Sequence, residues 1–314
     1  MADGSRDPAG PSAGRGAGDS IRRHSRSFSF ASRLLPTGKR QAVEQLYAWC
    51  RWCDDGVDTA STPEHAAAFL DQAAHDLRLI AAGGVPTAIE SRWLASLVRQ
   101  YGLPIEAAGA LLEGMRTDLV PVADLDEDDL LRYCFRVAGA VGVLMCPILG
   151  LEDRRFLPHA AALGMGMQLT NIARDVAEDW RRSRCYLPVD WTGGLRPGSA
   201  PPDEGGVRRG VEGILGLADG YYLAGEAGIP ALDRGARVAV RTASRVYHAI
   251  GIEIRRRRFR VLERRARVST GAKLRLFVSA LLTSAVPGDA SRLPPVAERA
   301  LTTAARLLRE HGVS

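Results

Sequence analysis

Long hydrophobic runs are missing from this sequence. The longest uncharged apolar run, 137–151, contains Pro147 and is shorter than the ~20 apolar residues that a membrane-spanning helix needs. Residues 1–20 are rich in Gly, Ser, Pro, Asp and Arg and lack the apolar core of a secretory signal peptide. We therefore expect a soluble or peripheral protein rather than an integral membrane protein.

Cysteine is scarce and odd in number, with five residues at positions 50, 53, 134, 146 and 185. An odd count without a secretory signal favours a reducing compartment over a disulfide framework. Cys50 and Cys53 form a C-x-x-C pattern, but a zinc site would need a second pair and a redox site a thioredoxin-like context. We interpret them as packing thiols on a helix and expect a cytoplasmic protein.

Lysine is nearly absent, with Lys39 and Lys273 its only occurrences, so arginine carries the net charge of +6. A basic balance suits nucleic acid, an anionic membrane or a diphosphate substrate. The run Arg255 to Arg258 is typical of a solvated helix face or of a contact with acidic lipid headgroups. Nucleic-acid recognition would need interleaved aromatic residues, and only Phe259 is near. We expect no nucleic-acid partner and a peripheral position on the inner face of the membrane.

Alternating strand patterns and internal repeats are also missing, so the expected fold class is all-α. Residues 1–22 are poor in apolar side chains and predict a disordered tail, followed by one helical domain over 23–314. Apolar spacing and Gly or Pro punctuation predict helices over 38–58, 63–82, 89–101, 105–118, 125–149, 163–186, 207–227, 229–250, 251–266, 272–286 and 295–310. Residues 189–206 predict a surface loop.

A polar stripe runs along the predicted helix that begins near Leu163. Gln168, Asn171, Asp175 and Asp179 recur at steps of three or four and therefore share one helix face. Such a stripe beside apolar surface is costly if it is buried without partners. Mg2+ fits it, because this ion is usually held by one or two carboxylates together with substrate phosphates. A solvated helix face is the alternative.

The same spacing occurs a second time, which favours the metal interpretation. Asp54 and Asp58 are four residues apart, and Arg51 precedes them by one turn. Two acidic helix faces, each with a nearby arginine, predict two walls of a metal–diphosphate cavity. Near the N-terminus, Ser25 or Ser27 fits either a helix cap or an anion site at the start of a helix.

Six short motifs resemble those of the squalene/phytoene synthase family, and within it the bacterial phytoene synthases. They are HSRSF (24–28), YAWCRWCDDGVD (47–58), YCFRVAGAVG (133–142), QLTNIARDVAED (168–179), RCYLP (184–188) and ERRARVS (263–269). The resemblance covers residues 24–287 and implies a class I isoprenoid synthase helical fold with a central active-site cavity. It implies head-to-head condensation of two geranylgeranyl diphosphates through a cyclopropyl (prephytoene) diphosphate to phytoene, in carotenoid biosynthesis.

The resemblance also implies roles for individual residues, with Mg2+ (or Mn2+) as cofactor and without NADPH. The implied metal ligands are Asp54, Asp58, Asn171, Asp175 and Asp179. The implied contacts to the substrate diphosphate are His24, Ser25, Arg26, Ser27, Arg51, Gln168, Arg174 and Arg265, with Arg264 as the alternative to its neighbour. The aromatic residues expected to line the cavity of the allylic cation are Phe28, Tyr47, Tyr186 and Tyr247, the last as a catalytic residue.

Three points stay open at this stage. The small residues in 137–143 and 163–167 fit either tight helix packing or the floor for a prenyl tail. A C30 enzyme that uses farnesyl diphosphate is the same-class alternative, and a helical scaffold without activity or a terpene cyclase are the others. Gly56 departs from the bulkier residue that is common between the first-motif aspartates, which puts the reach of Asp58 in doubt.

Overall fold

A computed structural model describes residues 32–198, 202–284 and 293–313. Its elements, with α for α-helices and η for π- or 3-10 helices, are α3 (Thr37–Asp58), α4 (Pro63–Ala81), α5 (Ile89–Tyr101), α6 (Ile105–Thr117), α7 (Glu127–Cys134), η1 (Phe135–Gly139), α8 (Ala140–Met145), η2 (Arg154–Phe156), α9 (Leu157–Arg181), α10 (Val189–Thr192), α11 (Glu204–Gly228), η3 (Ile229–Ala231), α12 (Arg234–Arg256), α13 (Thr270–Ser284) and α14 (Pro295–Glu310). The described residues form no strand, which confirms the all-α prediction. The expected tail lies outside them.

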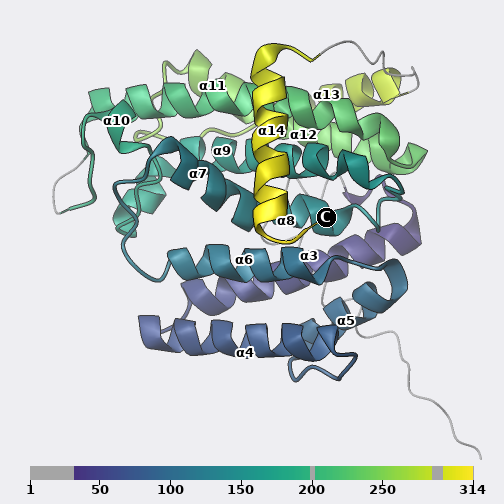
Figure 1. The fold of residues 1–314 in the computed structure, drawn as a ribbon. Helices are drawn as coiled ribbons and strands as arrows, with labels where there is room; N and C mark the ends of the chain where they lie inside the picture. Colours follow the sequence, from purple (N-terminus) through teal and green to yellow (C-terminus); the bar gives the residue numbers. More distant parts are fainter. Residues whose placement is uncertain (1–31, 199–201, 285–292, 314) are drawn as a thin grey trace, which may run out of the picture.

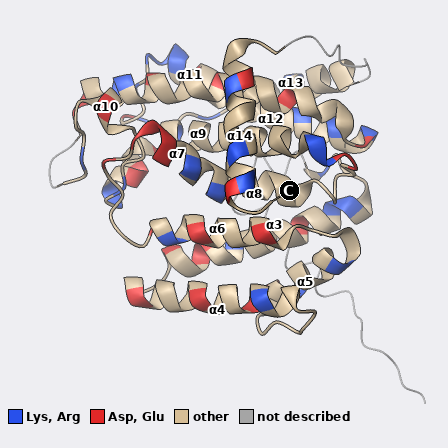
Figure 2. Ribbon diagram, in the orientation of Figure 1, with Lys and Arg blue, Asp and Glu red and all other residues tan. Residues whose placement is uncertain are grey.

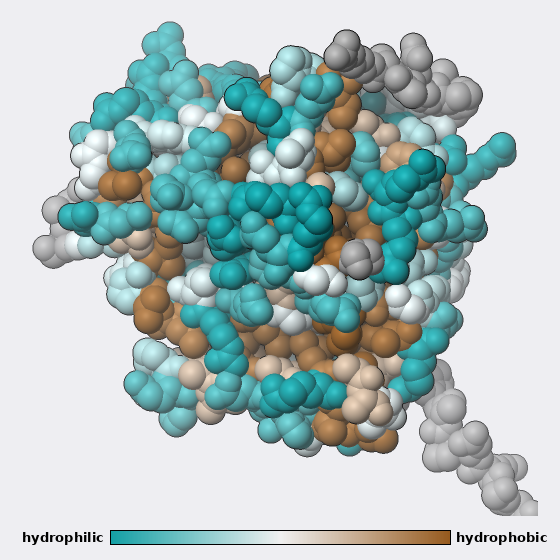
Figure 3. Space-filling model, in the orientation of Figure 1, coloured by the Kyte–Doolittle hydropathy of each residue, from teal (hydrophilic) through white to brown (hydrophobic). Residues whose placement is uncertain are grey.

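Helix α9 lies at the centre of the bundle. It packs against α11 and α12 on one side and against η1 and α8 on the other, while α14 crosses these helices at a steep angle (Figure 1). Helices α3, α4, α5 and α6 form the remaining layers, and hydrophobic residues fill the space between α4 and α6 (Figure 3). No helix among the described ranges is long and apolar enough to span a bilayer.

Local signals explain several helix ends. Thr62 accepts a hydrogen bond from the backbone N–H of His65 with Pro63 in the first turn, so α4 begins where the sequence predicts. Gly102, at φ +68°, ends α5 in the left-handed conformation. Asp126 and Asp129 form a capping box at the acidic start of α7 (Figure 2).

The single helix predicted over 125–149 is wrong in two respects. A π-helical turn, η1, interrupts it, and the helix ends at Met145. Such turns insert one extra residue and are frequent at functional sites. Glycines allow the close packing on each side of the turn, because a Cβ on Gly142 would lie 2.5 Å from the Ala160 carbonyl oxygen and one on Gly164 would lie 2.3 Å from that of Ala138. The packing interpretation therefore holds for these two glycines.

Three other predicted boundaries are corrected. Helix α9 begins at Leu157 rather than at 163, and it ends at Arg181 rather than at 186, because Ser183 takes φ +57° and the Cys185 N–H then bonds to the Val122 carbonyl. Helix α12 continues through Gly251 and ends at Arg256. A Cβ added to Gly251 would lie 3.2 Å from the Leu215 side chain. The predicted loop 189–206 contains α10 and the start of α11.

The four-arginine run is not one solvated face. Arg255 binds Asp219 at 2.7 Å, and both Arg256 and Arg257 pair with Glu253, at 2.7 and 2.6 Å. The run also crosses the end of α12, because Arg258 already has a positive φ. Two carboxylates therefore offset half of its positive charge within the protein.

Candidate active site

The first acidic motif occupies the last two turns of α3. Arg51 reaches forward along the helix and binds Asp54 at 2.5 Å and Asp55 at 2.6 Å. Burial raises the pKa of Asp54, and the nearby carboxylates of Asp58 and Asp118 raise it further while Arg51 lowers it. The motif therefore holds negative charge that its own arginine offsets only in part.

Gly56 allows α4 to pack closely against α3. A Cβ at this position would lie 2.3 Å from the ring of Phe69, which packs edge-on against Trp52 at 4.7 Å between ring centroids. The glycine lets α4 approach α3, and the helix continues to Asp58. The doubt about the reach of Asp58 is removed, since its carboxylate is held by two arginines from another segment.

Those two arginines follow α9 and join the acidic motifs. Arg182 binds Asp58 at 2.7 Å, and Arg184 lies 3.6 Å from the other oxygen of the same carboxylate. A tight turn after α9 orients these two arginines, because the N–H groups of residues 182 and 184 both donate to the Asp179 carbonyl oxygen. The ends of α3 and α9 therefore face each other across a cationic bridge.

The second acidic motif lies on α9. Asp175 is 16% exposed and accepts hydrogen bonds from Arg174 at 2.8 Å and from Arg265 at 2.9 Å. Burial raises the pKa of Asp179 to about 7, and repulsion from Asp175 adds to this while Arg184 opposes it. Arg265 therefore lies against the second acidic motif, whereas for Arg264, which is exposed, no side-chain hydrogen bond or ion pair is found among the described residues.

Asp118, at the end of α6, is a site residue that sequence reasoning missed. It accepts hydrogen bonds from the hydroxyls of Tyr186 at 2.6 Å and Tyr133 at 3.0 Å, and the two rings stack with centroids 4.5 Å apart. Burial raises the pKa of Asp118, and these hydroxyls and Arg184 lower it. Arg184 also donates to the Asp118 carbonyl oxygen at 3.0 Å. Tyr133 and Arg184 stand in quoted motifs, but no sequence pattern pointed to the aspartate.

Aromatic side chains from α3 and α12 meet near the arginines. Burial raises the pKa of Tyr47 to about 12, and its neighbour Tyr247 raises it further. Tyr247 is in turn close enough to Arg174 to raise the pKa of that guanidinium. On α9, the Asn171 amide donates to Gln168 at 3.2 Å. The residues 24–28 lie outside the described part of the chain.

The donor set fits a hard divalent cation. Among the described residues, no three acidic, histidine or cysteine side chains lie close enough together to form a complete coordination sphere. Mg2+ does not need one, because it keeps several waters and takes substrate phosphate oxygens beside one or two carboxylates. The pKa values of Asp54, Asp118 and Asp179 are raised, first by burial and then by repulsion from neighbouring carboxylates such as Asp58 and Asp175. A cation would relieve this repulsion.

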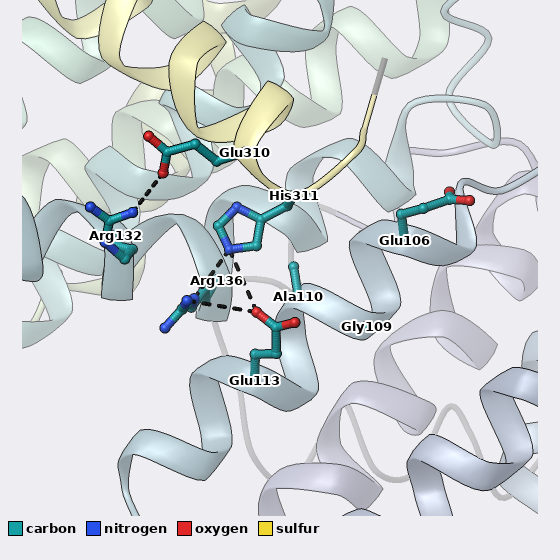
Figure 4. Close-up of a pocket in the computed structure, with 8 residues that line it drawn as sticks. All are labelled: Glu106, Gly109, Ala110, Glu113, Arg132, Arg136, Glu310 and His311. Carbon is teal, nitrogen blue, oxygen red and sulfur yellow. Dashed lines mark hydrogen bonds and ion pairs between the residues drawn. The ribbon is translucent and has the colours of Figure 1, made fainter.

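A charged cleft of about 460 Å³ lies elsewhere, between α6, α7 and the end of α14 (Figure 4). Arg132 binds Glu310 at 2.6 Å there, and the Arg136 Nε donates to the His311 Nε2 at 3.1 Å. Neither acidic motif contributes to it. A cavity of only about 10 Å³ lies beside Asp179 and is lined by Ile172, Val176, Asp179, Trp180, Arg184, Cys185, Tyr186 and Leu187.

Comparisons with known proteins agree with this geometry. The family model described as squalene/phytoene synthase matches residues 21–272. The phytoene synthase of Rhodobacter capsulatus is 36% identical over 284 residues, which is 89% of this chain and 83% of that protein. The 15-cis-phytoene synthase of a Paracoccus species is 34% identical, covering 82% of this chain and 87% of its own.

Among solved structures, a dehydrosqualene synthase in complex with a ligand is similar with a TM-score of 0.76 and 26% identity, over 86% of this chain and 95% of that one. A squalene synthase from Alicyclobacillus acidocaldarius is similar with a TM-score of 0.66 and 26% identity, over 80% of this chain and 97% of its own. These likenesses show the isoprenoid synthase helical fold.

Proposed function

The chain belongs to the squalene/phytoene synthase family, and we propose that it is a Mg2+-dependent phytoene synthase. It condenses two molecules of geranylgeranyl diphosphate head to head, through a cyclopropyl diphosphate, to phytoene. The main structural support for this function is the ion pair between Arg182, just after the second acidic motif, and Asp58 of the first. The chain is also 33–37% identical to several phytoene synthases. A scaffold without activity would have no reason to keep a cluster of mutually repelling carboxyls.

Mg2+ is proposed to bind between Asp54 and Asp58 of α3 and Asn171, Asp175 and Asp179 of α9. When bound, it supplies positive charge that makes diphosphate a better leaving group. In the structure, arginines already occupy part of this space, with Asp58 held by Arg182 and Asp175 held by Arg174 and Arg265. We propose that these side chains turn from the carboxylates to the diphosphate when substrate binds.

The arginines suit that exchange. A guanidinium is planar and always charged, and it matches phosphate oxygens with a fork of two donors. Arg51, Arg174 and Arg265 are the proposed diphosphate contacts, and Arg182 and Arg184 join them on the evidence of their place between the motifs. Charge that develops on the leaving group is therefore met by guanidinium donors that turn to the diphosphate when it binds.

The aromatic cluster is proposed to shelter the allylic cation. The faces of Tyr47 and Tyr247 offer negative π-density. The Tyr47 hydroxyl stays protonated because burial raises the pKa of that group to about 12. A protonated phenol is a poor nucleophile, so it does not trap the cation. We propose that no NADPH is used, that the protein is cytoplasmic, and that it works at the inner face of the membrane.

Turnover of geranylgeranyl diphosphate with and without metal tests the proposal. We expect phytoene with Mg2+ (or Mn2+), no product with a chelator, and no product from Asp54→Ala with Mg2+ while its circular dichroism stays helical. The control is Asp55→Ala, which removes an acidic neighbour on the same helix and leaves both members of the spaced pair in place. Full activity in the chelator, or of Asp54→Ala with Mg2+, would overturn the metal assignment.

A further inference from the structure

Helix α13 carries a hydrophobic stripe on its outer side. Four of its large apolar residues are exposed, namely Leu274 (56%), Val278 (46%), Leu281 (49%) and Leu282 (68%). At about 100° per residue, their spacing places all four within roughly 100° of one another around the helix. Scattered exposed apolar residues are normal on soluble proteins, but a contiguous group marks an interaction site. These four residues are the α13 stripe.

The side of α13 that faces the protein holds the buried Ala280 and the half-buried Leu276 and Phe277, so this helix has apolar residues on its inner and its outer side. Arg245 of α12 donates to the hydroxyls of Ser279 at 2.7 Å and Thr283 at 3.0 Å, and Arg241 donates to Ser284 at 2.8 Å. Within α13, only Ala280 is buried. The helix lies at the edge of the bundle, beside α12 (Figure 1), and the four residues of the α13 stripe are exposed.

The charged residues of α13 and of the segment just before it have one sign. From Arg264 to Gly288 the sequence contains Arg264, Arg265, Arg267, Lys273 and Arg275 and no acidic residue. An apolar helix face flanked by cations suits the boundary between acyl chains and anionic headgroups, because burial of apolar area and attraction to lipid phosphate then add together. The four-arginine run at 255–258 offers less of this, since Glu253 and Asp219 offset two of its four positive charges.

We propose that the α13 stripe docks the protein on an anionic lipid surface. This inference rests on the proposed function in one respect: the proposed function supplies the reason for docking, which is to release a hydrocarbon product into a membrane. The Arg265 side chain, five residues before α13, already contacts the second acidic motif, so the docked helix is connected to the site through a short segment.

Vesicle co-sedimentation of the full chain, without substrate, tests this proposal. The probes are vesicles of phosphatidylcholine alone and of phosphatidylcholine mixed with phosphatidylglycerol. We expect wild type to bind the anionic vesicles at low salt, and the double variant Leu274→Gln/Leu282→Gln to bind at least about tenfold more weakly, because two apolar side chains no longer leave water. The matched control Leu223→Gln changes a 48% exposed leucine of α11 and should bind within about twofold of wild type.

Two further measurements make the outcome decisive. The double variant should keep wild-type activity in detergent micelles, and absence of phytoene from wild type under the same conditions would count against the proposed function rather than against docking. Equal vesicle binding by wild type and the double variant, or no binding by wild type, would overturn the docking proposal. So would a wild-type oligomer that the double variant dissociates in size-exclusion chromatography, because a second copy of the chain would then cover the stripe.

Discussion

Two aspartates on α9, one helical turn apart, should respond to the same substitution with opposite changes in stability. Asp179 sits among carboxyls in a partly dry space, whereas Asp175 is held by Arg174 and Arg265. Changing either to asparagine removes one charge at nearly constant volume. We expect Asp179→Asn to stabilise the metal-free protein and Asp175→Asn to destabilise it, while each lowers turnover at least about a hundredfold.

The magnitudes follow from the two environments. A rise in the pKa of Asp179 from 3.8 to about 7 corresponds to at most about 4 kcal/mol of unfolding free energy lost when the carboxyl ionises. Because the side chain keeps some contact with water, we expect Asp179→Asn to gain about 1–3 kcal/mol near pH 7.5. Asp175→Asn leaves the Arg174 guanidinium, 16% exposed, without its carboxylate and should lose about 2–4 kcal/mol.

The gain in Asp179→Asn should depend on pH in a defined direction. The folded state binds the Asp179 proton more tightly than the unfolded state, so wild-type stability falls as pH rises from about 4 to about 7. The difference between variant and wild type should therefore be largest above pH 7 and shrink as pH approaches 4.

Urea unfolding in a chelator, followed by circular dichroism at several pH values, measures both effects. Added Mg2+ should then stabilise wild type more than Asp179→Asn, because the ion removes the repulsion that the variant has already lost. The reasoning is refuted if the two variants are destabilised alike, or if the difference between Asp179→Asn and wild type is the same at pH 4 and pH 7.5.

Three further predictions concern the walls of the site. Tyr186→Phe should lower the unfolding free energy by about 1.5–3 kcal/mol in urea titrations at pH 7, because Asp118 loses a 2.6 Å hydrogen bond; an unchanged midpoint would contradict this. Gly164→Leu should lose several kcal/mol and abolish use of the C15 and C20 substrates alike, because its Cβ would lie 2.3 Å from a backbone oxygen of η1; selective loss of the C20 substrate would instead favour a pocket floor. Arg265→Gln should raise KM for the diphosphate substrate about tenfold and Arg264→Gln less than twofold, and equal effects in steady-state kinetics would show that contact with Asp175 does not select the phosphate ligand.

Local signals in the sequence were sufficient for much of the fold. Helices α5 and α14 have the predicted bounds, because apolar spacing, Pro295 and Gly102 act within a few residues. The π-turn η1 was not predictable in this way. It depends on how closely α8 and α9 approach through Gly142 and Gly164, which is a property of two segments together.

The candidate site was likewise predictable only where its residues are neighbours on one helix. The i, i+4 spacing of Asp54 with Asp58 and of Asp175 with Asp179 identified both acidic faces, since a helix fixes such neighbours. Asp118 has no partner at helical spacing, and its role comes from Tyr133 and Tyr186, which are distant in sequence. Which arginine binds which carboxylate likewise depends on the turn after α9 and not on spacing.

Competition between the two prenyl diphosphates tests the central claim most directly. The purified chain is given equal amounts of geranylgeranyl and farnesyl diphosphate with Mg2+ and without NADPH, and the lipid products are identified by mass spectrometry. Each CH2-sized group buried is worth ~0.8 kcal/mol, so a pocket shaped for the longer chain should favour it over one that is five carbons shorter. The account predicts phytoene as the main product, and a product that is mainly C30, or none from geranylgeranyl diphosphate, would contradict it.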